Sequence, residues 1–197
     1  CCAWHHQYRE RMRKRLIAET MASHYIGIPL INVHLGGAPK TIPRDKAISD
    51  AAEMIDAVCK EIPDIQIAIE NSEGSGTRYG GAFDDIAETI QQSVYQHRLG
   101  VSLNLSHAFA WGYDFRTLPK YEQFMRHLDR LFNRDKIKIV FMNDSKTSFG
   151  SKFDAHENLG EGKIGKNILA YFCMDKSNLH IPFILETPNM EIWRNEV

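Results

Sequence analysis

The chain has 197 residues, of which 43% are hydrophobic and 25% charged, as expected for a globular domain with a sizeable buried core. Its 24 basic and 25 acidic residues leave a net charge of −1, which neither requires nor excludes nucleic acid, because a basic patch can be local. No run approaches the roughly 18 consecutive apolar residues of a membrane-spanning helix, and no signal peptide is visible, so no membrane span is expected.

The predicted elements alternate between helices and short apolar strands. In chain order we expect a helix over 5–24, a strand over 28–34, a helix over 45–61, a strand over 65–70, a helix over 82–97, a strand over 101–107, a helix over 120–133, a strand over 137–143, a helix over 163–175, a strand over 181–186 and a helix from Glu191. This alternation predicts βα units and an α/β fold with a parallel sheet. No linker or low-complexity segment interrupts it, which indicates a single domain.

Each predicted strand ends in a residue that can bind a metal or make a hydrogen bond. The carboxyl ends of parallel strands meet at one edge of a sheet, which carries the active site in (β/α) barrels and open α/β sheets. A lone histidine at such an end is more often structural, but polar residues at five equivalent ends predict a metal site. Imidazole and carboxylate together suit Zn²⁺, Mn²⁺ or iron. The residues are His34, Glu70, His107, Asn143 with Asp144, and Glu186.

The segment 140–165, which continues from the fourth predicted strand, is rich in polar residues and glycine. Asp154 and His156 are two positions apart, so both side chains point the same way if the segment is extended. With His107 they would form a His₂Asp metal site; the alternative is a polar surface loop. The GEGKIG sequence at 160–165 precedes a predicted helix, whose first amides would favour phosphate.

Five segments resemble the endonuclease IV family of apurinic/apyrimidinic endonucleases. They are NVHLGG (32–37), IENSEGSG (69–76), SHAFAWGYD (106–114), NDSKTSFGSKFDAHENLGEGKIG (143–165) and ILETP (184–188), in the order the family has them. The resemblance implies a TIM-type (β/α)₈ barrel. Such a barrel needs eight strands and about 250 residues. We therefore expect 1–197 to be one incomplete barrel domain with about the last five βα units, truncated at its N-terminus and also at its C-terminus.

The resemblance implies a DNA base-excision repair enzyme of the deoxyribonuclease IV type. Such an enzyme hydrolyses the phosphodiester on the 5′ side of an abasic site in double-stranded DNA, using metal-activated water, and the full-length protein would be a monomer. Three zinc ions are implied, with Mn²⁺ as an alternative metal. The implied ligands are His34 for the first zinc, Glu70 between the first and second, Glu186 for the second, and His107, Asp154 and His156 for the third; Glu70 and Glu186 are also the implied catalytic residues.

Two positions depart from the family pattern, and both fall on the second zinc. Asn104 stands where the family has aspartate, and an uncharged amide oxygen is a weaker zinc ligand. Phe141 stands where the family has histidine, and it cannot bind a metal. Fewer than three metals are therefore possible. The alternative function is a catalytically degenerate relative that keeps the fold and one zinc site. A sugar isomerase-like barrel is a third option, which the NDSK and GEG loops disfavour.

Several residues near the predicted metal edge are candidates for contact with DNA. They are Arg78, Tyr79, Trp111, Tyr113, Lys146 and Ser151. Packing inside the protein is an equally good explanation for Trp111 and Tyr113. The basic run at 9–15 is expected to be a solvated helix face, and His5 and His6 are expected at the surface.

The cysteines indicate a reducing, intracellular compartment. Cys1, Cys2, Cys59 and Cys173 include no CxxC pair and no regular spacing, which predicts free thiols. The protein would then lie in the cytoplasm or nucleoid of a bacterium, or in the nucleus or mitochondrion of a eukaryote.

Overall fold

The computed structural model describes residues 6–196, so the predictions for Cys1, Cys2 and the side chains of His5 and His6 fall outside the described part. Five parallel strands form one sheet in the order β1 (Leu30–His34), β2 (Gln66–Glu70), β3 (Leu99–Asn104), β4 (Ile137–Phe141) and β7 (Phe183–Ile184). The predicted α/β fold with a parallel five-stranded sheet is therefore confirmed. None of the helices within 6–196 is long and apolar enough to cross a bilayer.

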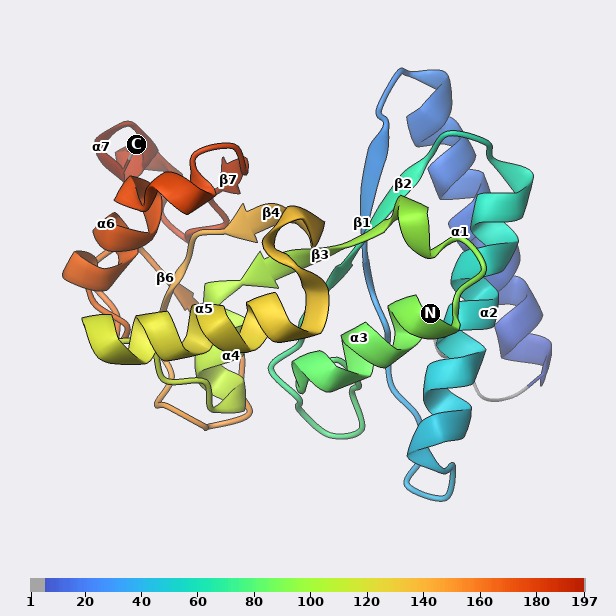
Figure 1. Cartoon of the computed structure of the whole chain (residues 1–197), viewed down its shortest axis with the longest axis horizontal. Helices are drawn as coiled ribbons and strands as arrows, with labels where there is room; N and C mark the ends of the chain where they lie inside the picture. The colour runs from blue at the N-terminus through green and yellow to red at the C-terminus, as the bar shows by residue number, and fades with distance from the viewer. Residues whose placement is uncertain (1–5, 197) are drawn as a thin grey trace.

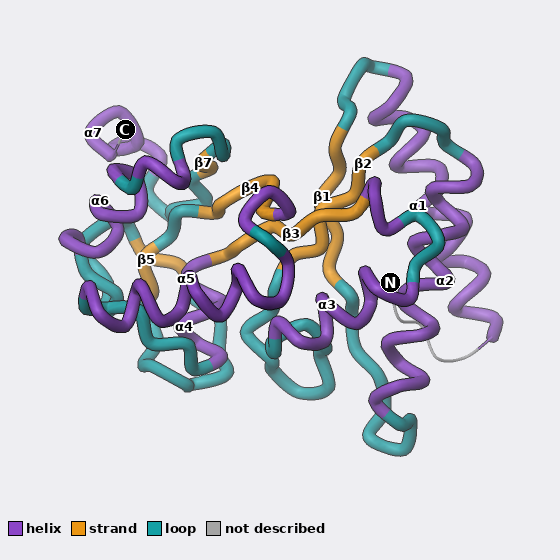
Figure 2. The backbone as a smooth tube through the Cα atoms, in the orientation of Figure 1, coloured by secondary structure: helices purple, strands orange, loops and turns teal. Residues whose placement is uncertain are grey.

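The helices lie on one side of this twisted sheet (Figures 1 and 2). They are α1 (His6–Tyr25), α2 (Arg44–Glu61), α3 (Phe83–Gln92), α4 (Leu105–Trp111), α5 (Leu118–Phe132), α6 (Lys166–Met174) and α7 (Trp193–Glu196). α1 packs on α2, α2 on α3, and α3 on α5. The loops that follow the strands lie at the carboxyl ends of the strands, at the edge of the sheet opposite to the one where the chain enters β1. The predicted site lies at this carboxyl edge.

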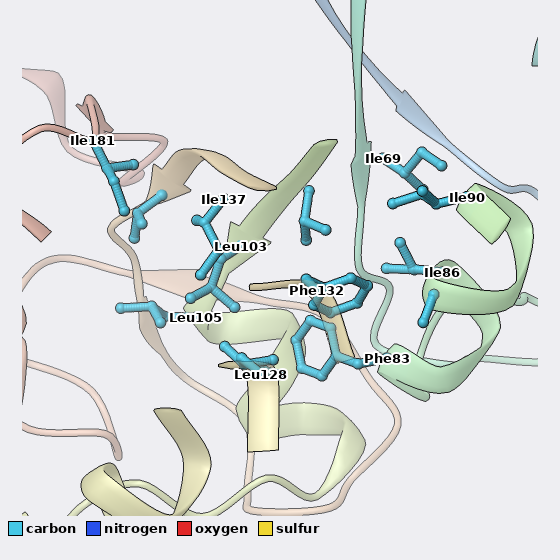
Figure 3. Close-up of a cluster of buried hydrophobic side chains, with 14 of the residues drawn as sticks. Ile69, Phe83, Ile86, Ile90, Leu103, Leu105, Leu128, Phe132, Ile137 and Ile181 are labelled. Carbon is cyan, nitrogen blue, oxygen red and sulfur yellow. The ribbon is translucent and has the colours of Figure 1, made fainter. Parts of the chain in front are cut away.

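The two faces of the strands have different chemistry, because successive side chains alternate. One face carries the apolar residues Val33, Ile67, Ile69, Val101 and Leu103, all buried. They pack with the inner faces of α3 and α5, where Phe83, Ile86, Leu128 and Phe132 close the core (Figure 3). The other face carries Asn32, His34, Glu70 and Asn104. The sequence thus separates a hydrophobic core from a polar inner surface.

Two predicted boundaries are wrong, and the first of them affects the site. The third strand ends at Asn104 rather than at residue 107, and α4 begins immediately after it. Asn104 is the N-cap of α4, and its side-chain oxygen accepts from the His107 N–H at 3.2 Å. His107 therefore lies in the first turn of a helix and not on a strand. The helix predicted over 82–97 ends at Gln92 and is followed by a 3₁₀ turn over Gln96–Arg98.

The polar segment after β4 contains a short antiparallel ribbon that was predicted only as a loop. Its strands are β5 (Asp144–Ser145) and β6 (His156–Glu157), with Ser145 opposite His156. A further backbone bond from the Lys146 N–H to the Ala155 carbonyl, at 2.9 Å, extends the pairing. The ribbon fixes the backbone of the Asp154–His156 segment next to α4.

Candidate metal centre

Three separate parts of the fold bring the predicted ligands together. His34 and Glu70 end β1 and β2 and are partners in the strand register. His107 comes from the first turn of α4, His156 comes from β6 of the ribbon, and Asp154 lies two residues before it in the loop. Within the described residues, the ligand atoms form two groups, each within 4.8 Å: His34 with Glu70 and His107, and His107 with Asp154 and His156.

The second group, which we call the His₂Asp triad, has the spacing of a zinc site. Asp154 lies between the two imidazoles: its Oδ2 is 3.2 Å from His107 Nε2, and its Oδ1 is 3.2 Å from His156 Nε2. Zinc bonds of about 2.0–2.1 Å at tetrahedral angles separate the ligand atoms by about 3.3 Å. His156 Nε2 is also buried, and no described residue hydrogen-bonds to it. The donor types and distances therefore fit a zinc ion.

Both histidines of the triad are oriented by their other ring nitrogen. His107 Nδ1 lies 2.9 Å from the Asn71 carbonyl oxygen, and His156 Nδ1 lies 3.2 Å from the Glu186 carbonyl oxygen. A carbonyl can only accept, so Nδ1 carries the proton and donates it. This leaves the Nε2 lone pair of each ring for a metal, which is the usual arrangement of a metal-binding histidine.

The first group is less complete than the triad. His34 Nε2 lies 3.4 Å from Glu70 Oε2 and the two could bind one metal. His107 Nδ1 is 3.3 Å from Glu70 Oε1, but this nitrogen already donates to Asn71. Asn32 and Asn104 donate their amide N–H groups to the two oxygens of Glu70, at 2.5 and 3.0 Å. The described residues thus provide two clear ligands here, and the Glu70 carboxylate is already hydrogen-bonded on both oxygens.

The charged groups of the centre shift the pKa values of their neighbours towards the ionised forms. Burial alone would lower the pKa of His107, but Asp154 and Glu70 outweigh it and raise the pKa to about 10. Burial would raise the pKa of Asp154, yet the neighbouring imidazoles of His107 and His156 bring it well below its usual range. Burial would also raise the pKa of Glu70, but His107, His34 and Asn32 outweigh this effect and lower the pKa. Both carboxyls are therefore anionic at neutral pH and ready to hold a cation.

Zinc binding should displace protons from the His₂Asp triad. The pKa of about 10 means that His107 carries a second proton at neutral pH without metal, and the pKa of His156 is also raised by Asp154 despite burial. We expect release of about one proton or more per zinc near pH 7. Calorimetric zinc titrations in two buffers of different ionisation enthalpy would measure this number. Equal apparent enthalpies in the two buffers would contradict the prediction.

Asn104 and Phe141 occupy the two positions at which the family pattern has aspartate and histidine as ligands of the second zinc. They are neighbours in the register of β3 and β4, and both are buried. The Asn104 oxygen accepts from the His107 N–H and its amide nitrogen donates to Glu70, so the side chain acts as a hydrogen-bonding group. Glu186 is exposed, and its carboxylate joins neither group of ligand atoms in 6–196, although its carbonyl orients His156.

Asp144 has a different task from the metal ligand that its strand-end position suggested. It is fully buried, and its two oxygens accept from five backbone N–H groups, at 2.8–3.3 Å. The donors are Ser145, Gly160, Gly162, Ile164 and Gly165. The aspartate therefore occupies most of the GEGKIG amides, whereas phosphate binding at the first amides of the following helix, α6, stays a prediction.

The DNA-contact candidates divide into two sets. Arg78 and Tyr79 line a pocket of about 370 Å³ beside His34, where Arg78 pairs with Glu73 at 2.9 Å. Lys146 and Ser151 are exposed near the ribbon. Trp111 and Tyr113 instead contact the protein itself, which favours packing. The Tyr113 ring lies 4.9 Å from that of Phe83, and its hydroxyl accepts from the Phe83 N–H at 3.2 Å.

Trp111 packs directly against the backbone of the loop after β2. A Cβ on Gly81 would lie 2.2 Å from Trp111 Cε3, a distance that side chains do not tolerate. We expect Gly81→Ala to lower the free energy of unfolding by about 1–3 kcal/mol through overpacking, measured by urea denaturation. The same change in a Trp111→Leu background should have a smaller effect. Equal effects in both backgrounds would contradict the contact.

Two residues that shape the centre were missed, and a third, Asp144, was expected in a different role. Asn32 and Asn71 act on Glu70 and His107, and Asp144 organises the following loop. The only local signal is that Asn71 directly follows Glu70 and that Asn32 shares a strand face with His34. No local signal in the sequence indicates the role of Asp144 in the loop, because its partners lie up to 21 positions away.

Comparison with known proteins gives one family and several related folds. A family model described as xylose isomerase-like TIM barrel matches residues 2–197. Endonuclease IV from Thermus thermophilus is 26% identical, with a TM-score of 0.78 over 91% of this chain and 62% of that one. The IOLI protein with a binding zinc atom is 13% identical (TM-score 0.69, 98% and 66% covered). A xylose isomerase domain containing protein from Salmonella typhimurium is also 13% identical (TM-score 0.57, 91% and 63% covered).

The last two similarities show the shared fold alone, because their identity is low. The chain spans less than two thirds of the length of each of these three structures. The five parallel strands thus correspond to part of a TIM barrel, as predicted.

Proposed function

The chain belongs to the xylose isomerase-like TIM barrel family, and from this premise we propose that it is a zinc-dependent phosphodiesterase of the endonuclease IV type. Its substrate would be double-stranded DNA with an abasic site, cut on the 5′ side of the lesion. The observation that carries the proposal is the His₂Asp triad beside Glu70 and His34. The 26% identity to an endonuclease IV over 91% of this chain supports the same reaction class.

The residues suggest how they would act on a phosphodiester. When bound, zinc neutralises phosphate charge and lowers the pKa of water towards 7. The anionic Asp154 and the Nε2 atoms of His107 and His156 would hold one ion. Glu70, kept anionic by its low pKa, would serve to hold a cation together with His34 rather than to donate a proton.

Other residues would position the substrate. The Arg78 guanidinium is half exposed at the pocket beside His34, where it could bind a backbone phosphate. Lys146 and Ser151 would contact the same strand near the triad. Glu186, as a second-zinc ligand and catalytic residue, stays a prediction. A monomer in a reducing compartment also stays a proposal.

A second candidate is a catalytically degenerate relative with one zinc. Asn104 and Phe141 favour it: the amide of Asn104 already occupies one Glu70 oxygen, and the buried Phe141 offers no ligand. The first group then keeps only His34 and Glu70, while the triad remains complete.

Metal content and DNA cleavage together separate the two candidates. We expect two or more metal ions per chain and a nick 5′ of a tetrahydrofuran abasic mimic in a duplex. One zinc with no nick would support the degenerate relative, and nicking without metal would contradict both. Phe141→His combined with Asn104→Asp should raise the metal count and the rate, since aspartate can still cap α4. An unmodified duplex is the substrate control.

A further inference from the structure

The loop of residues 147–153, between β5 and β6, is fixed to its surroundings by hydrogen bonds. The Gly150 N–H donates to the Phe109 carbonyl at 3.1 Å, which satisfies a carbonyl of the last turn of α4. The Thr147 hydroxyl donates to the Phe153 carbonyl at 2.9 Å. The loop backbone therefore has a defined position beside α4 (Figure 1).

Lys152 attaches the same loop to the end of α4. Its N–H donates to the Ala110 carbonyl at 2.9 Å, and its Nζ donates to the Trp111 carbonyl. Nζ also lies 3.1 Å from the centre of the Trp111 ring, where a cation is attracted to the π-face. A cation at a helix C-terminus is favourable as well.

Phe153 is held out from this fixed loop. Its side chain is 63% exposed, and no aromatic ring or cation stacks on it within residues 6–196. Phe149 is also half-exposed, but its ring lies 5.6 Å from that of Phe109 and 5.5 Å from the Arg116 guanidinium. Phe153 is thus an aromatic face without a stacking partner, and the next residue along the chain is the triad's Asp154.

The charge around Phe153 indicates what could cover it. Residues 145–153 contain Lys146 and Lys152 and no acidic residue; Lys146 lies 3.8 Å from Glu157, and Asp154 of the triad follows directly. Lys163 adds a cation nearby, since its Nζ donates to Ser148 at 3.1 Å. Flat aromatic groups joined by negative charges match such a surface, and a nucleic-acid strand has this chemistry.

We propose that Phe153 is a stacking platform for a nucleobase of the strand whose phosphate reaches the His₂Asp triad. This inference rests on the proposed function and adds a specific contact to it. The fixed loop backbone would present the ring without a large loss of loop entropy on binding. Lys146 and Lys163 would hold the phosphates near the stacked base, while Lys152 keeps the loop attached to α4.

The test uses the zinc-loaded chain and a fluorescent duplex with one tetrahydrofuran mimic, in a binding titration by anisotropy. Phe153→Ala and Phe153→Leu should weaken binding about 10-fold, because base–aromatic stacking is worth about 1–3 kcal/mol. Phe153→Trp should bind at least as well as the unchanged chain. Tyr25→Ala is the matched control: Tyr25 is 90% exposed at the end of α1, at the opposite edge of the sheet. Zinc content should be the same in all variants.

The outcomes separate the stacking contact of Phe153 from the proposed function. If the unchanged chain binds the duplex and Phe153→Ala or Phe153→Leu binds equally well, stacking is wrong while the proposed function stands. If binding occurs only to a single-stranded oligonucleotide and depends on Phe153, stacking is supported and the abasic-duplex substrate is wrong. If neither nucleic acid binds, both are wrong.

Discussion

Replacing His107 with alanine should remove zinc from the chain and abolish any hydrolysis. His107 Nε2 faces Asp154 at 3.2 Å, and the same ring contacts Glu70, so it is the one residue shared by both groups of ligand atoms. Loss of residues that only orient a ligand lowers metal affinity about 10–100-fold. Loss of the ligand itself should lower zinc affinity by at least about 100-fold. Competition with a fluorescent zinc chelator would measure this affinity.

Two further variants make this prediction specific. His107 is buried, so its removal could also weaken α4; His156→Ala changes only the ribbon side of the triad and should lose zinc affinity to a similar degree. His97→Ala is the matched control, because His97 is exposed on a 3₁₀ turn, and zinc affinity should not change. Undiminished zinc affinity in both triad variants would exclude the site.

Replacing Asp144 with asparagine should cause the largest loss of stability of any single charge-removing change. One amide oxygen would have to serve five N–H donors that a carboxylate now shares between two oxygens. Hydrogen bonds to charged groups contribute about 1.5–3 kcal/mol each, and buried donors without a partner are unfavourable. We expect the free energy of unfolding to fall by about 3–5 kcal/mol, measured by urea denaturation.

An exposed aspartate provides the control for this change. The Asp45 side chain is 92% exposed in the first turn of α2, and Asp45→Asn should change the free energy of unfolding by less than about 0.5 kcal/mol. Gly162→Ala tests the same contact from the other side, because its Cβ would lie 2.4 Å from Asp144 Oδ1. If Asp144→Asn unfolds like the Asp45 variant, Asp144 does not organise this loop.

The sequence predicted the features that repeat along the chain. Apolar runs such as those around Ile67 and Val101 identified all five strands of the sheet, because strands buried in a parallel sheet are mostly apolar. His34 and Glu70 then followed as residues at one edge. Asp154 and His156 point to one centre, as their spacing in an extended segment predicted.

The features that were missed depend on long-range contacts. His107 was placed on a strand, because nothing local shows that the Asn104 side chain caps a helix instead of continuing β3. The Asn32–Glu70 bond joins residues 38 positions apart. The close contact of Trp111 with Gly81 likewise appears only when two loops meet. Such contacts are set by the tertiary structure and leave no periodic pattern.

The contacts of Asp144 with five amides also determine whether folding or metal binding comes first. Zinc fingers are unfolded until zinc binds, because the ion is their only anchor. Here the Asp144 carboxylate already anchors the backbone on both sides of the ligand-bearing residues 154–156. The carbonyls of Asn71 and Glu186 already orient the imidazoles of His107 and His156. Folding would thus come first and loading second, so a chelator should empty the centre and leave the circular dichroism spectrum unchanged.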